Sequence, residues 1–275
     1  MARKHRPALA WDDLEIYDLI GMYGGRPASE LTAYFLRTCD DLWNKASKLG
    51  ITNYNAYDYI TLTDNQRSLI FASLLGNATI YRGKTGRQFA TIEFTHGARE
   101  LPYLQYKHAI LENLAQPNGI QHRTRQQYTY HRFITRYLAC LNDIYAVICR
   151  DGGNRCVTKE WLAELSHPSA LAVWFMDVGD IQPLYRSKIE RAQKISRGHN
   201  LRLYLHVKTR NEAVIIHKWL EREWGIEMNL HTIQYSHTKN EHYVLQRAVA
   251  GVVHEFIALI EPYVIQPMQH KIDLV

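Results

Sequence analysis

The sequence predicts an α+β protein built from two similar halves and preceded by a small helical segment. A helix, a hairpin, a helix, a hairpin and a closing helix follow one another twice along the chain, and the first helix of each set ends at Asn77 and Val178, respectively. Such recurrence of element order indicates an internal duplication even where the residues themselves have diverged. We therefore expect a duplicated arrangement of helices on two antiparallel sheets.

Composition limits the classes of protein that fit the chain. A hydrophobic fraction of 46% and a charged fraction of 22% are typical of a globular protein and exclude a disordered one. No apolar run approaches the length of a membrane helix, and the basic start has no apolar stretch of a signal peptide. The four cysteines contain no C-x-x-C pair. We expect a protein without membrane contact in the cytoplasm, or in an organellar matrix if the gene is organellar.

Residues 1–50 carry the signals of three short helices with a tight turn before the third. We expect a helix-turn-helix-like domain, in which Leu14, Tyr17, Leu19 and Ile20 share one face of the first helix. The alternative is a small helical cap on the main domain.

The remaining domain boundaries follow from changes in pattern. Residues 51–62 are polar and aromatic without helical periodicity, which is typical of a linker. A capping box from Thr63 to Gln66 then opens the next helix. We place the first half at 63–165 and the second half at 166–275.

Basic residues gather in the predicted hairpins, with tyrosines between them, and the whole chain has a net charge of +6. One such segment is usually a solvated surface, but three in matching places of a duplicated unit favour a polyanionic partner. We predict that they bind nucleic acid through phosphates and base edges. The candidates are Arg82, Lys84 and Arg87; Arg123, Arg125 and Arg132; and Arg186, Lys188, Arg191, Lys194, Arg197 and Arg202.

Two segments resemble the signature helices of LAGLIDADG homing endonucleases: "LIFASLLGNATI" at 69–80 and "ALAVWFMDVGDI" at 170–181. The second is similar to the W-F-M-D-D-G form of the single-chain branch with two motifs. Supporting segments "HAILENLAQ", "KWLEREWGIEMNLHT" and "FIALIEPYVIQPMQHKI" follow in order, so that the resemblance covers about residues 62–273.

The resemblance implies a pseudo-twofold αββαββα fold. In this family, the two signature helices pack together and two saddle-shaped sheets grip duplex DNA in the major groove. Ala72 and Gly76, four residues apart, fit a close approach between such helices.

The resemblance also implies an acidic residue at the tip of each signature helix, where the pair holds divalent metal ions beside the scissile phosphates. In this chain those positions are Asn77 and Val178, which supply no negative charge. Asp177 and Lys271 are candidate remnants of the site. We therefore expect no catalytic residues, no bound metal and no cofactor, with Mg²⁺ required only if nuclease activity is retained.

Three functions fit these observations. The first is a sequence-specific duplex DNA-binding protein derived from a homing endonuclease, a pseudo-enzyme without nuclease activity. The alternatives are a maturase that binds structured group I intron RNA and an active metal-dependent DNA endonuclease. A helix-turn-helix favours DNA because the groove of A-form RNA does not admit a helix. We expect a monomer, because one chain contains both signature helices.

Overall fold

The computed structural model describes residues 10–23, 28–50, 60–82, 89–125, 127–150, 153–185, 187–193, 196–207, 209–234 and 241–273. The candidate residues Lys84, Arg87, Arg186 and Lys194 lie outside these ranges. The described residues form two separate hydrophobic clusters, a small one between Leu19 and Ala46 and a large one between Leu69 and Ile272. Within the described ranges, no helix is long and apolar enough to cross a membrane.

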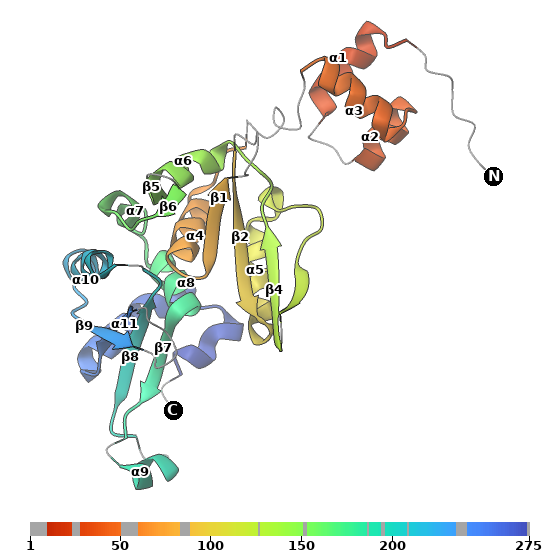
Figure 1. Cartoon of the computed structure of the whole chain (residues 1–275). Helices are drawn as coiled ribbons and strands as arrows, with labels where there is room; N and C mark the ends of the chain where they lie inside the picture. Colours follow the sequence, from red (N-terminus) through yellow and green to blue (C-terminus); the bar gives the residue numbers. More distant parts are fainter. Residues whose placement is uncertain are drawn as a thin grey trace.

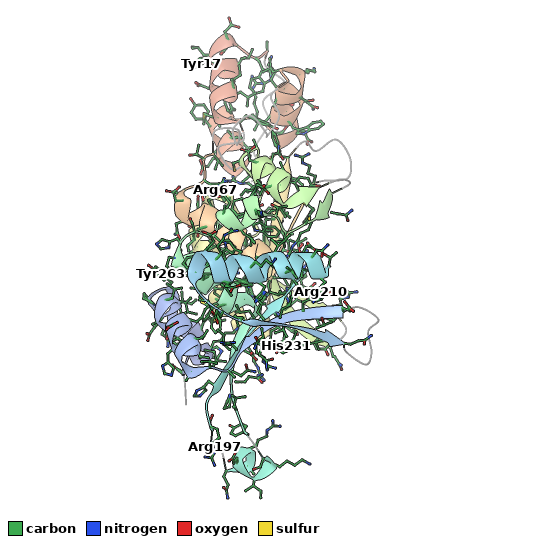
Figure 2. The ribbon with its side chains drawn as sticks, turned by 90° about the vertical axis from the view of Figure 1, so that its left-hand side faces the viewer. Tyr17, Arg67, Arg197, Arg210, His231 and Tyr263 are labelled. Carbon is green, nitrogen blue, oxygen red and sulfur yellow. The ribbon has the colours of Figure 1, made fainter. Side chains whose placement is uncertain are left out.

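The N-terminal helices are α1 (Asp13–Met22), α2 (Ala28–Phe35) and α3 (Cys39–Lys48). The prediction that Leu14, Tyr17, Leu19 and Ile20 share one face of α1 is wrong. Leu19 is fully buried, whereas Leu14 and Tyr17 are 77% and 75% exposed and Ile20 is also exposed. Figure 2 labels Tyr17 on α1. At about 100° per residue, Tyr17 lies nearly opposite Leu19, and the buried face continues from Leu19 to Tyr23 instead.

The first half contains a four-stranded antiparallel sheet in the order β1-β2-β4-β3. Helix α4 leads directly into this sheet, and its Thr63–Gln66 capping box is confirmed. The elements are α4 (Asp64–Leu75), β1 (Ala78–Arg82), β2 (Ala90–Gly97), α5 (Leu101–Ile110), β3 (Gln121–Arg125), β4 (Tyr128–Ile134) and α6 (Cys140–Ile148).

The second half repeats this arrangement with the strand order β7-β8-β10-β9. The predicted duplication is confirmed, because equivalent strands occupy equivalent places in the two sheets (Figure 1). The elements are α8 (Pro168–Val178), β7 (Gly179–Pro183), β8 (His199–Leu205), α10 (Arg210–Trp224), β9 (Asn229–Gln234), β10 (Glu241–Arg247) and α11 (Ala250–Ile260).

Each sheet has one apolar face and one open face. Phe94 and Phe133 are paired across β2 and β4, and their rings stack 4.7 Å apart against the helices. Leu203 and Leu245 form the equivalent buried pair across β8 and β10. Alternate residues therefore stand on the opposite face of each sheet, where polar and basic side chains gather.

Two short additions depart from the predicted pattern. The halves are joined by a small hairpin of β5 (Cys149–Arg150) and β6 (Asn154–Arg155), followed by α7 (Lys159–Ala163). The basic segment after β7, expected as strand, contains helix α9 (Lys188–Ala192), which is capped by Ser187 and lies at the far end of the β7–β8 connection (Figure 1). The local cap and the acid Glu190 favour a helical turn there.

Helices α4 and α8 pack against each other at the centre of the large core (Figure 1). A side chain at Gly76 would place its Cβ 2.5 Å from the Cβ of Asp177, so glycine allows the contact. Ala72 and Ala172 are also fully buried. The close approach expected from the small residues Ala72 and Gly76 is thus present.

A buried ion pair joins the halves beside this contact. Lys107 of α5 donates to the Asp177 carboxylate of α8 at 2.6 Å, and both side chains are fully buried. Burial lowers the pKa of Lys107, although the Asp177 charge opposes this shift. The Tyr103 hydroxyl adds a hydrogen bond to the carbonyl of Val173 at 3.1 Å.

Replacing Lys107 with Met should lower the free energy of unfolding by about 3–5 kcal/mol, because it leaves the Asp177 carboxylate buried without its cation. The double variant Lys107→Met/Asp177→Asn should recover part of this stability. Urea unfolding followed by circular dichroism measures both. Arg222→Met is the control, since Arg222 pairs with Glu223 at the exposed surface. Equal midpoints for Lys107→Met and Arg222→Met would contradict a structural role for the buried pair.

Candidate nucleic-acid interface

The tips of α4 and α8 contact each other directly. Asn77 lies in the turn between α4 and β1, and its side-chain amide donates to the backbone carbonyl of Asp177 at 3.0 Å. The backbone N–H of Asn77 donates to the Asp177 carboxylate at 3.3 Å. Asn77 therefore bonds to the opposite helix, in the position where the sequence resemblance implies an acid.

The second tip position is apolar and covered. Val178 is 6% exposed at the end of α8. The neighbouring Asp177 carboxylate is held by Lys107 and Asn77, and His96 Nε2 lies 3.6 Å from it. The two tip positions and Asp177 thus present no exposed carboxylate.

Lys271 and Asp180 lie near the second tip, each with a partner. Lys271 donates to the carbonyl of Met176 at 2.6 Å, and burial lowers its pKa against the opposing charges of nearby acids. Asp180 pairs with Arg202 at 3.2 Å. Across the described residues, no group of three His, Cys, Asp or Glu side chains is arranged to hold a metal ion.

Sequence reasoning missed Lys107, His96 and Glu100. His96 hydrogen-bonds Glu100 at 3.0 Å, while Lys107 is the cation closest to Asp177. One signal was available for Lys107: it lies three and four residues after the buried Leu104 and Tyr103, on the inward face of α5.

On the open face of the first sheet, the structure brings together three predicted residues. Arg123 and Arg125 lie on the edge strand β3 and are exposed, and Arg132 lies next to them on β4. Arg132 is half-buried and donates to Glu93 of β2 at 3.0 Å.

Arg82 lies elsewhere. It ends β1 with the same alternation as the buried Ile80, and its guanidinium stands 4.5 Å from the ring centroid of Tyr145 on α6. This contact is on the helical side of the sheet.

The predicted residues of the second half are divided between two places. Arg202 of β8 lies on the open face of the sheet, opposite Asp180 on β7 and Gln246 on β10. Lys188, Arg191 and Arg197 are exposed on or beside α9, away from the sheet, where Figure 2 labels Arg197. The second half therefore presents cations both on a strand surface and on a separate projection.

The described N-terminal residues, 10–23 and 28–50, contain seven Asp and Glu residues and three Lys and Arg residues, which gives 3 − 7 = −4. Arg37 is paired with Glu15 at 2.7 Å. The remaining two cations, Lys45 and Lys48, lie on α3, where Trp43 is 62% exposed.

The curated proteins that are similar in sequence to this chain are named Protein RecA. The chain is 25% identical over 214 residues to Protein RecA of Mycobacterium shimoidei, and 26% identical over 214 residues to Protein RecA of Mycolicibacterium fallax. Both alignments cover 77% of this chain and 47% of the relative. The chain therefore spans about half the length of these curated relatives.

The fold is similar to a solved structure described as the homing endonuclease I-WcaI bound to its DNA recognition sequence. The TM-score is 0.63 at 17% identity, with 80% of this chain and 92% of the other covered. Residues 67–250 match the model of the LAGLIDADG DNA endonuclease family. Because this match covers most of the chain and both signature helices, the protein belongs to the LAGLIDADG DNA endonuclease family.

Proposed function

We propose that this protein binds duplex DNA sequence-specifically and does not cleave it. The observation that carries the proposal is the chemistry of the helix tips. Asn77 and Val178 provide no anionic ligand, and the nearest carboxylate, Asp177, is bound by Lys107. Divalent ions such as Mg²⁺ require hard anionic oxygen ligands, and the residues present do not fit such an ion.

The open faces of the two sheets support duplex binding. Each is an antiparallel surface with arginine side chains standing away from the core, including Arg132 in the first half and Arg202 in the second. The major groove of B-DNA, about 12 Å wide, admits antiparallel strands, and arginine can contact both phosphates and base edges there. The similar structure of I-WcaI is described as bound to DNA, which is consistent with the proposal.

The N-terminal helices are proposed to add a second contact as a helix-turn-helix domain, with boundaries at 1–50, a linker at 51–62, and the halves at 63–165 and 166–275. Their separate hydrophobic cluster supports an independent unit. The exposed side of α3, with Trp43 and Lys48, is the side proposed to face DNA. The protein is proposed to act as a monomer, because α4 and α8 already pack within one chain.

Duplex binding should weaken steeply with salt, because arginine and lysine release counterions from phosphates. Replacing both Lys188 and Arg191 with Ala should reduce the slope of log K against log salt by about 0.9 for each phosphate that is no longer neutralised. Fluorescence anisotropy with a labelled duplex measures the slope, with Arg222→Ala as a control. An unchanged slope for the double variant would show that α9 does not contact the phosphates.

Stronger binding to structured intron RNA than to duplex DNA would support the maturase alternative.

The unmodified protein should show no strand cleavage above background on its best-bound duplex with Mg²⁺ or Mn²⁺, because the tips cannot fix a metal ion beside the phosphates. The variant Asn77→Asp/Val178→Asp should bind Mn²⁺ more tightly than the parent in calorimetry. Cleavage by the double variant is not required, since surrounding ligands tune a metal site. Efficient double-strand cleavage by the unmodified protein would refute the loss of nuclease activity.

Removing residues 1–60 should leave a folded core, because among the described residues of this segment only partly buried Ile60 packs against the large hydrophobic cluster. The truncated protein should give a shorter footprint on the same duplex than the full chain. Nuclease protection compares the footprints, and thermal unfolding confirms that the core is intact. An identical footprint would favour the alternative of a helical cap.

A further inference from the structure

Each open sheet face carries an arginine paired with a carboxylate on a neighbouring strand. In the second half, Arg202 of β8 contacts Asp180 of β7 through two hydrogen bonds of 3.2 and 3.3 Å. In the first half, Arg132 of β4 contacts Glu93 of β2 at 3.0 Å. The four side chains are 21–34% exposed, so they are partly packed yet reachable from the open face.

The carboxylates of the two pairs lie on equivalent rungs of the two sheets. The rung that joins Asp180 to Arg202 is the second of the β7–β8 ladder, and the rung that joins Thr79 to Glu93 is the second of the β1–β2 ladder. Both ladders begin immediately after the tip residues. Each carboxylate therefore lies close to a helix tip, while Arg132 lies on the Thr95 rung of β2 and β4.

The carboxylate contacts differ between the two arginines: Arg132 donates to Glu93 through Nη1 alone, whereas Arg202 is held at two points. Arg202 uses its Nε–H and one Nη2–H on Asp180, which leaves its Nη1 hydrogens unused by the described residues. A guanidinium has five donors in a planar fork, so the outer edge can still donate two parallel hydrogen bonds. Fixing the fork in advance reduces the entropy that binding would cost.

The two parallel donors on the outer edge of the fork match guanine better than the other bases. Guanine presents two acceptors, N7 and O6, in the major groove, and cytosine presents an N4 amino donor. The arginine fork fits the guanine edge, while the adjacent carboxylate can accept from cytosine. Adenine places an amino donor where guanine has O6, so it opposes the arginine.

We propose, on the basis of the proposed duplex binding, that Arg202 with Asp180 and Arg132 with Glu93 are specificity-determining pairs, each of which reads a G·C base pair on its side of the DNA centre. Exposed cations such as Lys188 on α9 have no such oriented partner on a strand and contact phosphates without regard to sequence.

Selection of bound duplexes from a random-sequence library with the full chain tests the proposal. The selected site should contain a G·C pair on each side of its centre. Replacing the G·C base pair that faces the second half of the protein with A·T should weaken binding on the order of tenfold in competition anisotropy. Arg202→Lys keeps the charge but not the planar fork, so it should lose this tenfold discrimination between the G·C and A·T duplexes. Asp180→Asn should reduce the same discrimination.

Two controls make the outcomes distinct. Lys188→Ala should weaken all duplexes by the same factor and leave base preference unchanged. Arg132→Lys should remove the preference in the first half only. If Arg202→Lys still prefers the G·C duplex over the A·T duplex, or if the selected site lacks these G·C pairs, the proposed base recognition is wrong. Neither result would contradict duplex binding itself. Failure of the unmodified protein to enrich any duplex would overturn both.

Discussion

The contact between α4 and α8 is the constraint on which the rest of the structure depends. Gly76 lets the backbone of α4 reach Asp177 of α8, where any side chain would collide. Because β1 starts at Ala78 and β7 starts at Gly179, each sheet begins immediately after the contact. The spacing of the two helices therefore fixes where the two sheets stand relative to each other, and a change at this contact would move both open faces.

The Lys107–Asp177 ion pair lies beside the α4–α8 contact and controls the orientation and charge of Asp177. A buried ion pair adds little net stability over apolar packing, because desolvation of the two charges offsets their attraction. Its effect here is on orientation and charge: the carboxylate nearest the tips is turned inward and neutralised by an internal cation. Asn77 then completes the arrangement by bonding to the same residue. Asp177 of the second half is thus bound by two residues of the first half, Lys107 and Asn77.

The sequence predicted the duplicated fold well, because long periodic segments and a capping box define helices and hairpins locally. It predicted the tip positions Asn77 and Val178 through their place in the two signature helices.

The sequence did not predict the partner of Asp177, since Lys107 is seventy residues away in sequence and only folding brings the two residues together. It also grouped the apolar residues of α1 on one face, whereas only Leu19 enters the small core, together with Tyr23 just after the helix. Helix α9 was missed because a five-residue helix gives too short a pattern to separate from basic strand.

Duplication within one chain has a consequence for the kind of target that such a protein can recognise. Two identical subunits related by a twofold axis must present the same side chains to both half-sites, which restricts them to palindromic targets. Here equivalent positions have already diverged: Glu93 of the first half corresponds to Arg202 of the second, and Thr79 to Asp180. Each half can accumulate substitutions without altering the other, so the duplex site of the proposed function need not be palindromic, and its two halves can be recognised by independently chosen residues.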